Sequence, residues 1–157
     1  WDQLKHDVKP IYTAVNAGKT VCRMDLKDAP TRDEFLALVD MSDVLLESFR
    51  PGVMARLGLD FETLAKRNPR LVYCSLSGYG VGGPLEQAAG HDDNYLAHAG
   101  VLHRNGDAAP MYFDPPIADV TGSLFAVIAI LGALRGRDHT GRGCAIDIAL
   151  ADVAVPL

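Results

Sequence analysis

Short apolar runs alternate with helical patterns along the first half of the chain. The runs have the length of buried strands, and between them apolar side chains recur every three or four positions, as on one face of a helix. The predicted strands are residues 19–26, 43–49 and 71–80, and the predicted helices are residues 29–42, 52–59 and 60–69. Strands that alternate with helices predict an α/β domain with a parallel sheet.

Capping and turn residues indicate where these helices begin and end. Thr31 followed by Glu34 predicts a capping box at the start of the first helix. Pro51 precedes the second helix, and Asn68-Pro69 ends the third. Ligands of parallel sheets bind at the carboxyl ends of the strands. We therefore expect a binding site where "ESFRPG" and "SGYGVGGP" follow the second and third strands.

The second half of the chain has a different pattern. Residues 91–116 are predicted to be rich in loops, residues 117–135 to form a long helix, and residues 143–150 to add a strand. The most apolar run, residues 122–134, is too short to span a bilayer and is followed by the charged segment "RGRDHTGRG". We therefore expect a buried helix there, and no membrane partner.

The composition is that of an ordinary globular protein, and 157 residues are enough for one domain with a core. A net charge of −5 argues against nucleic acid as the main partner, although local arginines can still bind a small anion. Cys22, Cys74 and Cys144 are far apart, so we expect reduced core thiols and a cytoplasmic location. The chain begins at Trp1 without a methionine and stops soon after an apolar segment begins, which predicts a fragment of a longer protein.

Arg50 and Arg56 stand on either side of a predicted helix start. The unpaired N–H groups and the dipole at such a position favour an anion, and two arginines there suit phosphates. The alternative is that both are surface side chains in weak ion pairs. Their spacing alone does not choose between these roles.

The segment "GHDDNYLAHAG", residues 90–100, places His91 beside Asp92 and Asp93. The sequence leaves three alternatives for this segment: a solvated charged segment, a metal site, or a catalytic base held in place. The lack of a second histidine at ligand spacing disfavours the metal site. Asp119 begins the most apolar helix, either as an N-cap or as a carboxyl group with a shifted pKa in a partly dry cleft. A pair of His91 and Asp119 for acid–base chemistry requires the fold to bring them together.

Several segments in the same order resemble the family III coenzyme A (CoA) transferases, most closely the α-methylacyl-CoA racemase branch. They are "NAGKTVCRMDLK" (16–27), "DVLLESFRPGVMARLGL" (43–59), "NPRLVYCSLSGYGVGGP" (68–84), "GHDDNYLAHAGVL" (90–102), "PPIADVTGS" (115–123) and "HTGRGCAIDIAL" (139–150). Together they cover nearly the whole chain. The resemblance implies that residues 1–157 are most of a Rossmann-like, parallel-sheet large domain, within a longer chain that forms an interlocked homodimer.

The resemblance also implies a role for individual residues. The catalytic aspartate of the family corresponds to Asp119, and the catalytic histidine of the racemase branch corresponds to His91. The implied contacts with CoA are Met24, Asp25, Leu26, Lys27, Ser48, Phe49, Arg50, Arg56, Ala88, Ala89, Gly90, Asp92, Asp93, Asn94 and Tyr95.

Two reactions are compatible with this resemblance. A racemase would use His91 and Asp119 to exchange the proton next to the thioester carbonyl of an acyl-CoA. A CoA-transferase would use Asp119 as a nucleophile that forms an anhydride and passes CoA to a second acid. A third alternative is a fragment that only binds CoA or dimerises. The resemblance implies no metal or redox cofactor, since CoA is part of the substrate.

Overall fold

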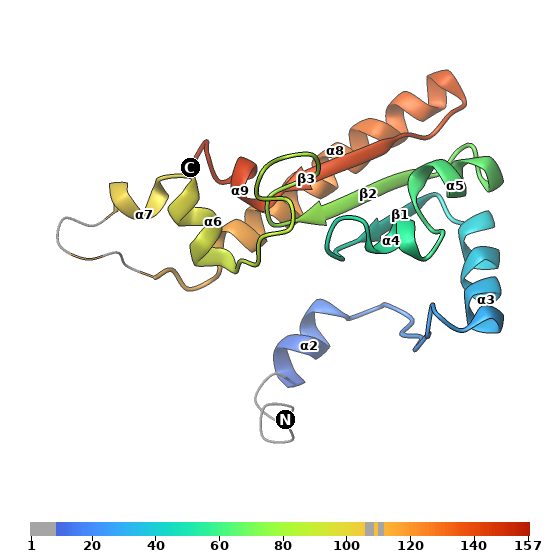
Figure 1. The fold of residues 1–157 in the computed structure, drawn as a ribbon, viewed down its shortest axis with the longest axis horizontal. Coiled ribbons are helices and arrows are strands. Elements are labelled where there is room, and N and C mark those ends of the chain that lie inside the picture. The colour runs from blue at the N-terminus through green and yellow to red at the C-terminus, as the bar shows by residue number, and fades with distance from the viewer. Residues whose placement is uncertain (1–8, 106–108, 110–111) are drawn as a thin grey trace.

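A parallel sheet lies at the centre of the computed structural model, which describes residues 9–105, 109 and 112–157. In the described part, the sheet has the strand order β1-β2-β3, with β1 at Val44–Glu47, β2 at Val72–Ser77 and β3 at Ala145–Ala149 (Figure 1). Both strand pairs are parallel. The predicted α/β architecture is therefore confirmed, as are the strands predicted at 43–49, 71–80 and 143–150. Trp1, where the sequence begins, lies outside the described residues.

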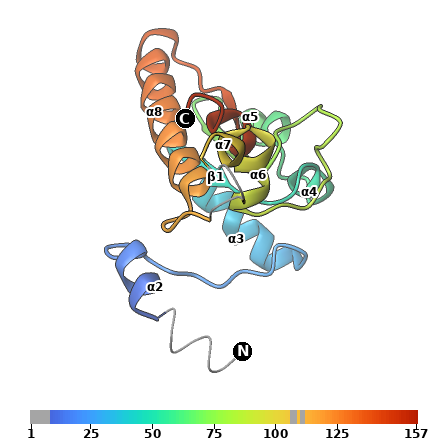
Figure 2. The same cartoon turned by 90° about the vertical axis from the view of Figure 1, so that its left-hand side faces the viewer.

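Helices cover both faces of this sheet. Figure 2 shows α8 on one side of it and α4 and α5 on the other. The helices predicted at 29–42, 52–59 and 60–69 correspond to α3, α4 and α5. The helices are α2 (Lys9–Val15), α3 (Ala29–Asp40), α4 (Val53–Arg56), α5 (Phe61–Arg67), α6 (Asp92–His98), α7 (Val101–Arg104), α8 (Ile117–Thr140) and α9 (Leu150–Val153).

One core cluster holds α3, α4 and α5 against β2. Leu59, Leu64 and Leu71 are fully buried in it, together with Val39 of α3 and Tyr73 of β2. Burying a leucine side chain contributes about 1.5–3 kcal/mol to folding. Because this cluster anchors α4, it also sets the position of the loop between β1 and α4, which carries part of the candidate site.

Aspartates cap the helices on this face. Asp28 Oδ2 accepts a hydrogen bond from the N–H of Thr31 across 3.2 Å, and Asp60 Oδ1 accepts one from the N–H of Thr63 across 2.9 Å. The predicted role of Thr31 as the N-cap of α3 is therefore wrong. Asp28, three residues before Thr31, takes that position because its carboxylate accepts from the free N–H groups of the first turn. Such a cap typically stabilises a protein by about 1 kcal/mol.

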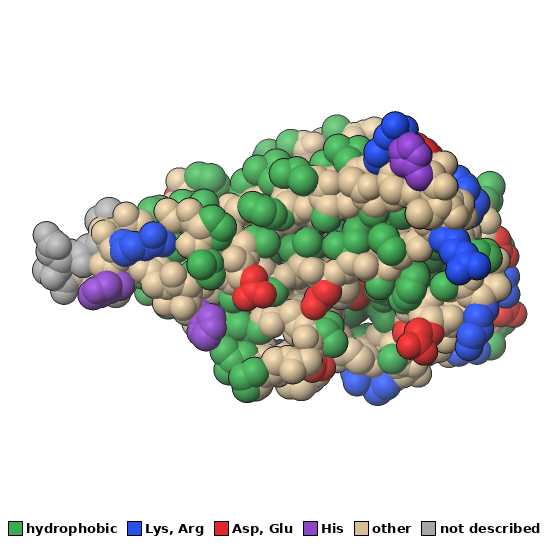
Figure 3. All heavy atoms as spheres, turned by 90° about the horizontal axis from the view of Figure 1, so that it is seen from above, with side chains coloured by type: hydrophobic (Ala, Val, Ile, Leu, Met, Phe, Trp, Pro, Cys, Tyr) green, Lys and Arg blue, Asp and Glu red, His purple; other side chains and the backbone are tan. Residues whose placement is uncertain are grey.

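Small side chains let α8 approach the other face of the sheet. Ala118, Gly122 and Ala126 are buried, and a Cβ at Gly122 would lie 2.2 Å from Leu150 Cδ2. Leu124, in contrast, is 59% exposed, and Figure 3 shows hydrophobic side chains spread over this side of the molecule. The predicted buried helix is thus wrong for most of α8. A continuous apolar run has no polar face, so the sequence pattern did not indicate that only one side of the helix packs against the sheet.

The length of α8 also differs from the prediction. It has 24 residues and contains an 18-residue window with a mean hydropathy of 2.1, and in the described part of the chain it is the one helix long and apolar enough to cross a membrane. The core helices of soluble proteins can meet the same criterion. The argument that residues 122–134 are too short to span a bilayer fails, because the apolar window of α8 that meets this criterion is 18 residues long.

Two further segments differ from their predicted structure. Residues 19–26 form no strand, and Val21 among them is 66% exposed; an apolar run becomes a strand only where a neighbour pairs its backbone groups. Residues 91–116 contain α6 and α7, which bury Leu96 and Leu102 in a second core cluster. Such short helices leave too few turns for a clear periodicity. Residues 106–108 and 110–111 lie outside the described part.

The three cysteines do not share one environment. Cys74, in the middle of β2, is buried against Ala126 of α8. Cys22 and Cys144 are exposed, and all three are free thiols. The prediction of core thiols is therefore confirmed for Cys74 only, because the other two lie outside the packed elements.

Candidate active site

A cavity of about 420 Å³ opens at the carboxyl ends of β1 and β2. The loop after β1, the glycine-rich turn after β2, the segment before α6 and the first turns of α8 form its wall. His91, Asp119, Arg50 and Tyr95 all line it. The cavity lies where "ESFRPG" and "SGYGVGGP" predict a binding site. It also brings His91 and Asp119 together from distant parts of the sequence.

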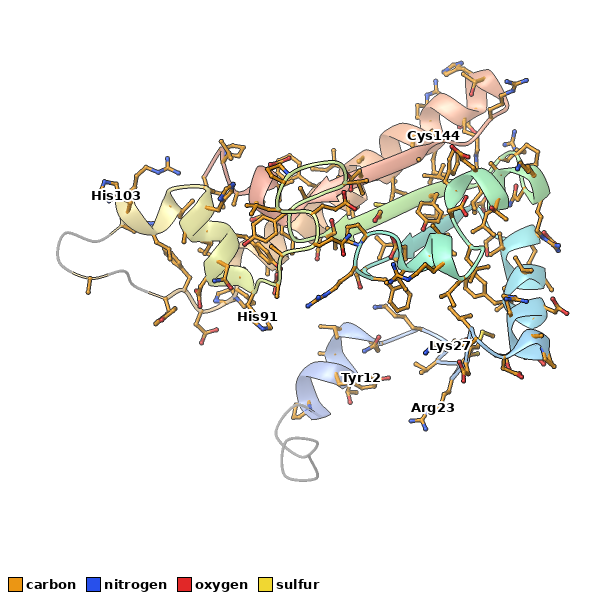
Figure 4. All side chains as sticks on the ribbon, in the orientation of Figure 1. Tyr12, Arg23, Lys27, His91, His103 and Cys144 are labelled. Carbon is orange, nitrogen blue, oxygen red and sulfur yellow. The ribbon has the colours of Figure 1, made fainter. Side chains whose placement is uncertain are left out.

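His91 directly precedes α6, and α6 holds the backbone on both sides of it. The N–H of His91 donates a hydrogen bond to Asn94 Oδ1 across 2.8 Å. The hydroxyl of Tyr95 donates one to the carbonyl oxygen of Gly90 across 2.7 Å. The His91 side chain itself is exposed, at the first turn of α6 (Figure 4). Its imidazole is thus exposed while α6 holds its backbone.

The ring of Tyr95 packs tightly between two glycines. A Cβ at Gly78 or at Gly90 would lie 2.6 Å from Tyr95 Cε1. Tyr79 adds an edge-on contact, with the ring centroids 5.2 Å apart. Burial raises the pKa of the Tyr95 hydroxyl, so the hydroxyl keeps its proton for the bond to Gly90.

A buried carboxylate links the first turns of α6 and α8. Asp92 exposes 9% of its surface, and its Oδ1 accepts a hydrogen bond from the N–H of Asp119 across 2.9 Å. The N-cap position of α8 is Pro116, whose side chain makes no capping bond. The alternative that Asp119 is the N-cap is therefore wrong. Asp119 is the third residue of α8, and the side chain that satisfies this helix start comes from Asp92.

The Asp119 carboxyl group has a raised pKa, although it is exposed in the cavity wall. Partial loss of hydration is the largest cause, the charge of Asp92 adds to it, and His91 opposes it. Groups that transfer protons often have pKa values shifted in this manner. Asp119 therefore has the electrostatic character expected of a proton donor, and His91 is close enough to influence it.

A second cavity, of about 660 Å³, shares Phe49 with the first. The segment before α3 and helix α4 form its other walls. Figure 4 shows the labelled Lys27 on that segment. Apolar side chains with Lys27 and Arg56 among them suit an anionic ligand that also has an apolar or planar part. The residues that line this cavity are Met24, Asp25, Leu26, Lys27, Phe49, Val53, Arg56 and Leu57.

The two arginines serve different cavities. Arg50 lines the first cavity and Arg56 lines the second. Neither side chain takes part in an ion pair with another described residue. Their arrangement therefore differs from the alternative of two surface arginines in weak ion pairs, and leaves both available to a ligand.

Most of the implied CoA contacts line one cavity or the other, but Asp92, Asp93 and Asn94 do not. Asp92 and Asn94 instead make the hydrogen bonds that hold Asp119 and His91. The structure thus gives two of these residues a supporting position behind the cavity wall. Ser48, Ala88, Ala89 and Gly90 line the first cavity, as the resemblance implies.

Some residues of the first cavity were missed in the sequence. Ser77, the last residue of β2, and Gly78 line it, and neither was named individually, although both belong to the segment "SGYGVGGP" that was expected to bind a ligand. Ser123 also lines it and donates a hydrogen bond to the Asp119 carbonyl across 2.9 Å. Its position one helical turn after Asp119 was the available signal, since residues four apart share a helix face.

The family of this chain follows from its sequence as a whole. Residues 2–157 match the model of CoA-transferase family III, so the chain belongs to this family. It is 41% identical to the acetyl-CoA:oxalate CoA-transferase of Acetobacter aceti over 144 residues, which cover 90% of this chain and 37% of that protein. It is 43% identical to human α-methylacyl-CoA racemase over 133 residues, 83% of this chain and 35% of that protein. The chain thus spans little more than a third of these relatives.

A solved structure supports the same conclusion for the fold. A CaiB/BaiF family protein from Brucella suis superposes with a TM-score of 0.85 and 36% sequence identity. The match covers 89% of this chain and 38% of the other. The predicted family and fold class are confirmed. The relatives include both racemases and CoA-transferases, so family membership leaves the reaction open.

Proposed function

We propose that the full-length protein exchanges the proton on the carbon next to the thioester of an acyl-CoA, and so inverts that centre. The observation that carries this proposal is that His91 and Asp119 line one cavity. Two groups of this kind, on opposite sides of a bound substrate, are what inversion by proton exchange requires. The identity of 43% to human α-methylacyl-CoA racemase supports the proposal.

In the proposed reaction the substrate carbon loses one proton and gains another. His91 takes the hydrogen next to the thioester as a proton, and the electrons of the broken C–H bond form an enolate. The protonated Asp119 carboxyl then donates its proton to the opposite face of the carbon. In the reverse direction the two groups exchange roles. Histidine suits this task because its ordinary pKa lies near neutral pH.

CoA binding is assigned to both cavities. The wall shared through Phe49 would let the acyl end lie near His91 while the rest of CoA occupies the second cavity. Lys27 and Arg56 would then contact phosphate groups. The reaction needs no metal or redox cofactor, since the substrate brings CoA with it. That the full-length protein forms an interlocked homodimer stays a prediction of the family resemblance.

The test is deuterium exchange in heavy water. A 2-methylacyl-CoA of one configuration is incubated with the full-length protein without an acceptor acid, and the label and configuration at carbon 2 are measured. The proposal expects deuterium incorporation together with inversion, and the loss of both in His91→Ala and Asp119→Ala. Exchange that persists in His91→Ala would show that the two-base assignment is wrong.

CoA transfer is the second candidate, favoured by the identity of 41% to the Acetobacter aceti enzyme and by the carboxyl group of Asp119 in the cavity. Asp119 would attack the thioester carbonyl, release CoA as thiolate and form a mixed anhydride. The thiolate would attack the Asp119 carbonyl carbon of this anhydride, giving an aspartyl thioester and freeing the first acid. A second carboxylate would attack this thioester, releasing the thiolate and forming a new anhydride. The thiolate would then attack the acyl carbon of the new anhydride, giving the second acyl-CoA and free Asp119. This candidate predicts no exchange in the experiment above, CoA transfer once a carboxylate is added, and a His91→Ala variant that keeps this activity.

A further inference from the structure

Asp92 is the one acidic side chain of the site that is buried. Its Oδ1 accepts the hydrogen bond from the N–H of Asp119, but its Oδ2 is buried without a hydrogen-bond partner among the described residues. A buried carboxylate oxygen normally has a donor, because an unpaired buried charge costs several kcal/mol. The sequence resemblance places Asp92 among the CoA contacts, yet it lines neither cavity. Its position therefore indicates a different role.

We propose that Asp92 is a positioning residue for proton exchange: it holds the first turn of α8 and, as a second acidic group beside Asp119, keeps a proton on the Asp119 carboxyl group. This inference rests on the proposed racemase reaction. A helix cap alone would not require an acid, since asparagine and serine cap helices equally well. The negative charge is what distinguishes the proposed role from a structural one.

The chemistry explains why such a charge is useful. When the substrate proton has been removed, His91 and Asp119 each hold a proton and the substrate is an enolate. An ordinary aspartic acid is ionised at neutral pH, so this state is unfavourable unless Asp119 binds its proton more tightly. The Asp92 carboxylate is bonded to the N–H of Asp119, and a negative charge at this place disfavours a second one on the Asp119 carboxyl group. The raised pKa of Asp119, to which Asp92 contributes, agrees with this arrangement.

Other titratable groups also surround the carboxyl groups of Asp92 and Asp119. His91 opposes the rise in the pKa of Asp119. Asp152 of α9 lines a separate cavity. The remaining titratable groups that face this place from the neighbouring elements are Arg50 after β1, Tyr79 after β2, Glu86 before α6 and Tyr95 on α6. None of these is both buried and bonded to Asp119, which distinguishes Asp92.

The first test is independent of catalysis. The free energy of unfolding of the full-length protein is measured against pH for the wild type and for Asp119→Asn, and the difference locates the titration of Asp119 in the folded state. The same pair is then measured with Asp92→Asn added to both. We expect the titration of Asp119 to move to lower pH, because the negative charge of Asp92 is removed. An unchanged titration would overturn the inference, whatever reaction the protein catalyses.

The second test uses exchange. Asp92→Asn keeps an oxygen that can accept from the N–H of Asp119, so helix α8 should still be capped. For each unit by which the pKa of Asp119 falls, we expect the rate of deuterium exchange at pH 7 to fall about tenfold. The acidic limb of the pH–rate profile should also move to lower pH. Asp138→Asn, an exposed aspartate at the far end of α8, should leave both unchanged.

Each outcome has one meaning. A wild type without exchange would remove the proposed function, while the unfolding comparison would still decide the position of the Asp119 titration. If Asp92→Asn exchanges deuterium with the same pH–rate profile as the wild type, Asp92 is only a helix cap and the inference is overturned. If Asp92→Asn fails to fold, Asp92→Ser takes its place, because a serine hydroxyl also caps helices but carries no charge.

Discussion

The hydroxyl of Tyr95 donates a hydrogen bond to the carbonyl oxygen of Gly90 across 2.7 Å, directly before the candidate base His91. Tyr95 exposes only 7% of its surface, and the bond itself is half-buried in the cavity wall. It joins the first turn of α6 to the loop that enters it. We therefore expect the orientation of His91 to depend on a tyrosine four residues later.

Tyr95→Phe tests this dependence. The ring should stay packed, but the Gly90 carbonyl should lose its donor, at a cost of about 1 kcal/mol in the free energy of unfolding. Because the loop before α6 is then less restrained, we expect proton exchange to fall more than stability alone explains. Urea unfolding of the full-length protein and the exchange assay measure the two effects. An exchange rate equal to that of the wild type would show that the bond does not orient His91.

Gly78→Ala tests the packing of the same ring. An added Cβ would lie 2.6 Å from both Cε1 and the hydroxyl oxygen of Tyr95, so the ring would have to move. Overpacking of this kind costs about 1–3 kcal/mol. Gly83→Ala is the matched control, since its Cβ would have no neighbour within 4 Å and its backbone is not left-handed. Thermal unfolding should separate the two variants, and equal melting temperatures would contradict the described packing.

The sequence predicted the strands of the sheet better than the contacts that position His91 and Asp119. The strands at β1, β2 and β3 consist of apolar runs bounded by turn residues, and local pattern is enough to identify them. Residues 19–26 have the same pattern but no strand to pair with, which no local pattern can reveal. Position alone left His91 and Asp119 with several roles, and only the family resemblance singled them out.

The hydrogen bond from the N–H of Asp119 to Asp92 could not be predicted from the sequence, for a different reason. It joins residues 27 positions apart, at the starts of two helices. The sequence pattern offered Asp119 as one alternative for the cap of α8, because it is the carboxylate in the first turn. The tertiary fold supplied one from α6 instead, because α6 packs beside the first turn of α8.

Arg137→Met should reveal how the far end of α8 is fastened. Arg137 is 8% exposed; its guanidinium donates to the carbonyl oxygens of Asp43 and Arg70 and contacts the Asp43 carboxylate across 2.8 Å. Methionine keeps the bulk but leaves the Arg70 carbonyl without a donor, while the Asp43 carbonyl keeps the N–H of Val72. We therefore expect a loss of about 2–3 kcal/mol. Arg67→Met breaks an exposed pair with Asp40 and should cost less than Arg137→Met, because solvent screens exposed ion pairs. Chemical denaturation of the two variants measures this difference, and equal losses would contradict the described role of Arg137.

The pH dependence of stability should report the state of Asp119. Its pKa in the folded protein is raised above the ordinary 3.8, mainly because of lost hydration. A raised pKa means that the folded state binds the proton more tightly, so the group stabilises at low pH and loses this contribution as pH rises through the folded pKa. Asp119→Asn should therefore gain stability relative to the wild type from about pH 4 upward. A constant difference across that range would show that Asp119 is not perturbed.

Arg56→Ala tests whether the second cavity holds CoA. Arg56 lies on α4 among the apolar residues of that cavity, away from His91, so it should bind substrate and transition state equally. Losing a charge-assisted hydrogen bond of about 1.5 kcal/mol would raise KM for the acyl-CoA about tenfold and leave kcat nearly unchanged. Arg135→Ala, which removes an exposed arginine of α8, is the control for the overall loss of positive charge. Steady-state kinetics of the full-length protein measure both constants. A KM that stays at the wild-type value, or that rises equally in both variants, would remove Arg56 from the CoA site and leave the second cavity without its assigned ligand.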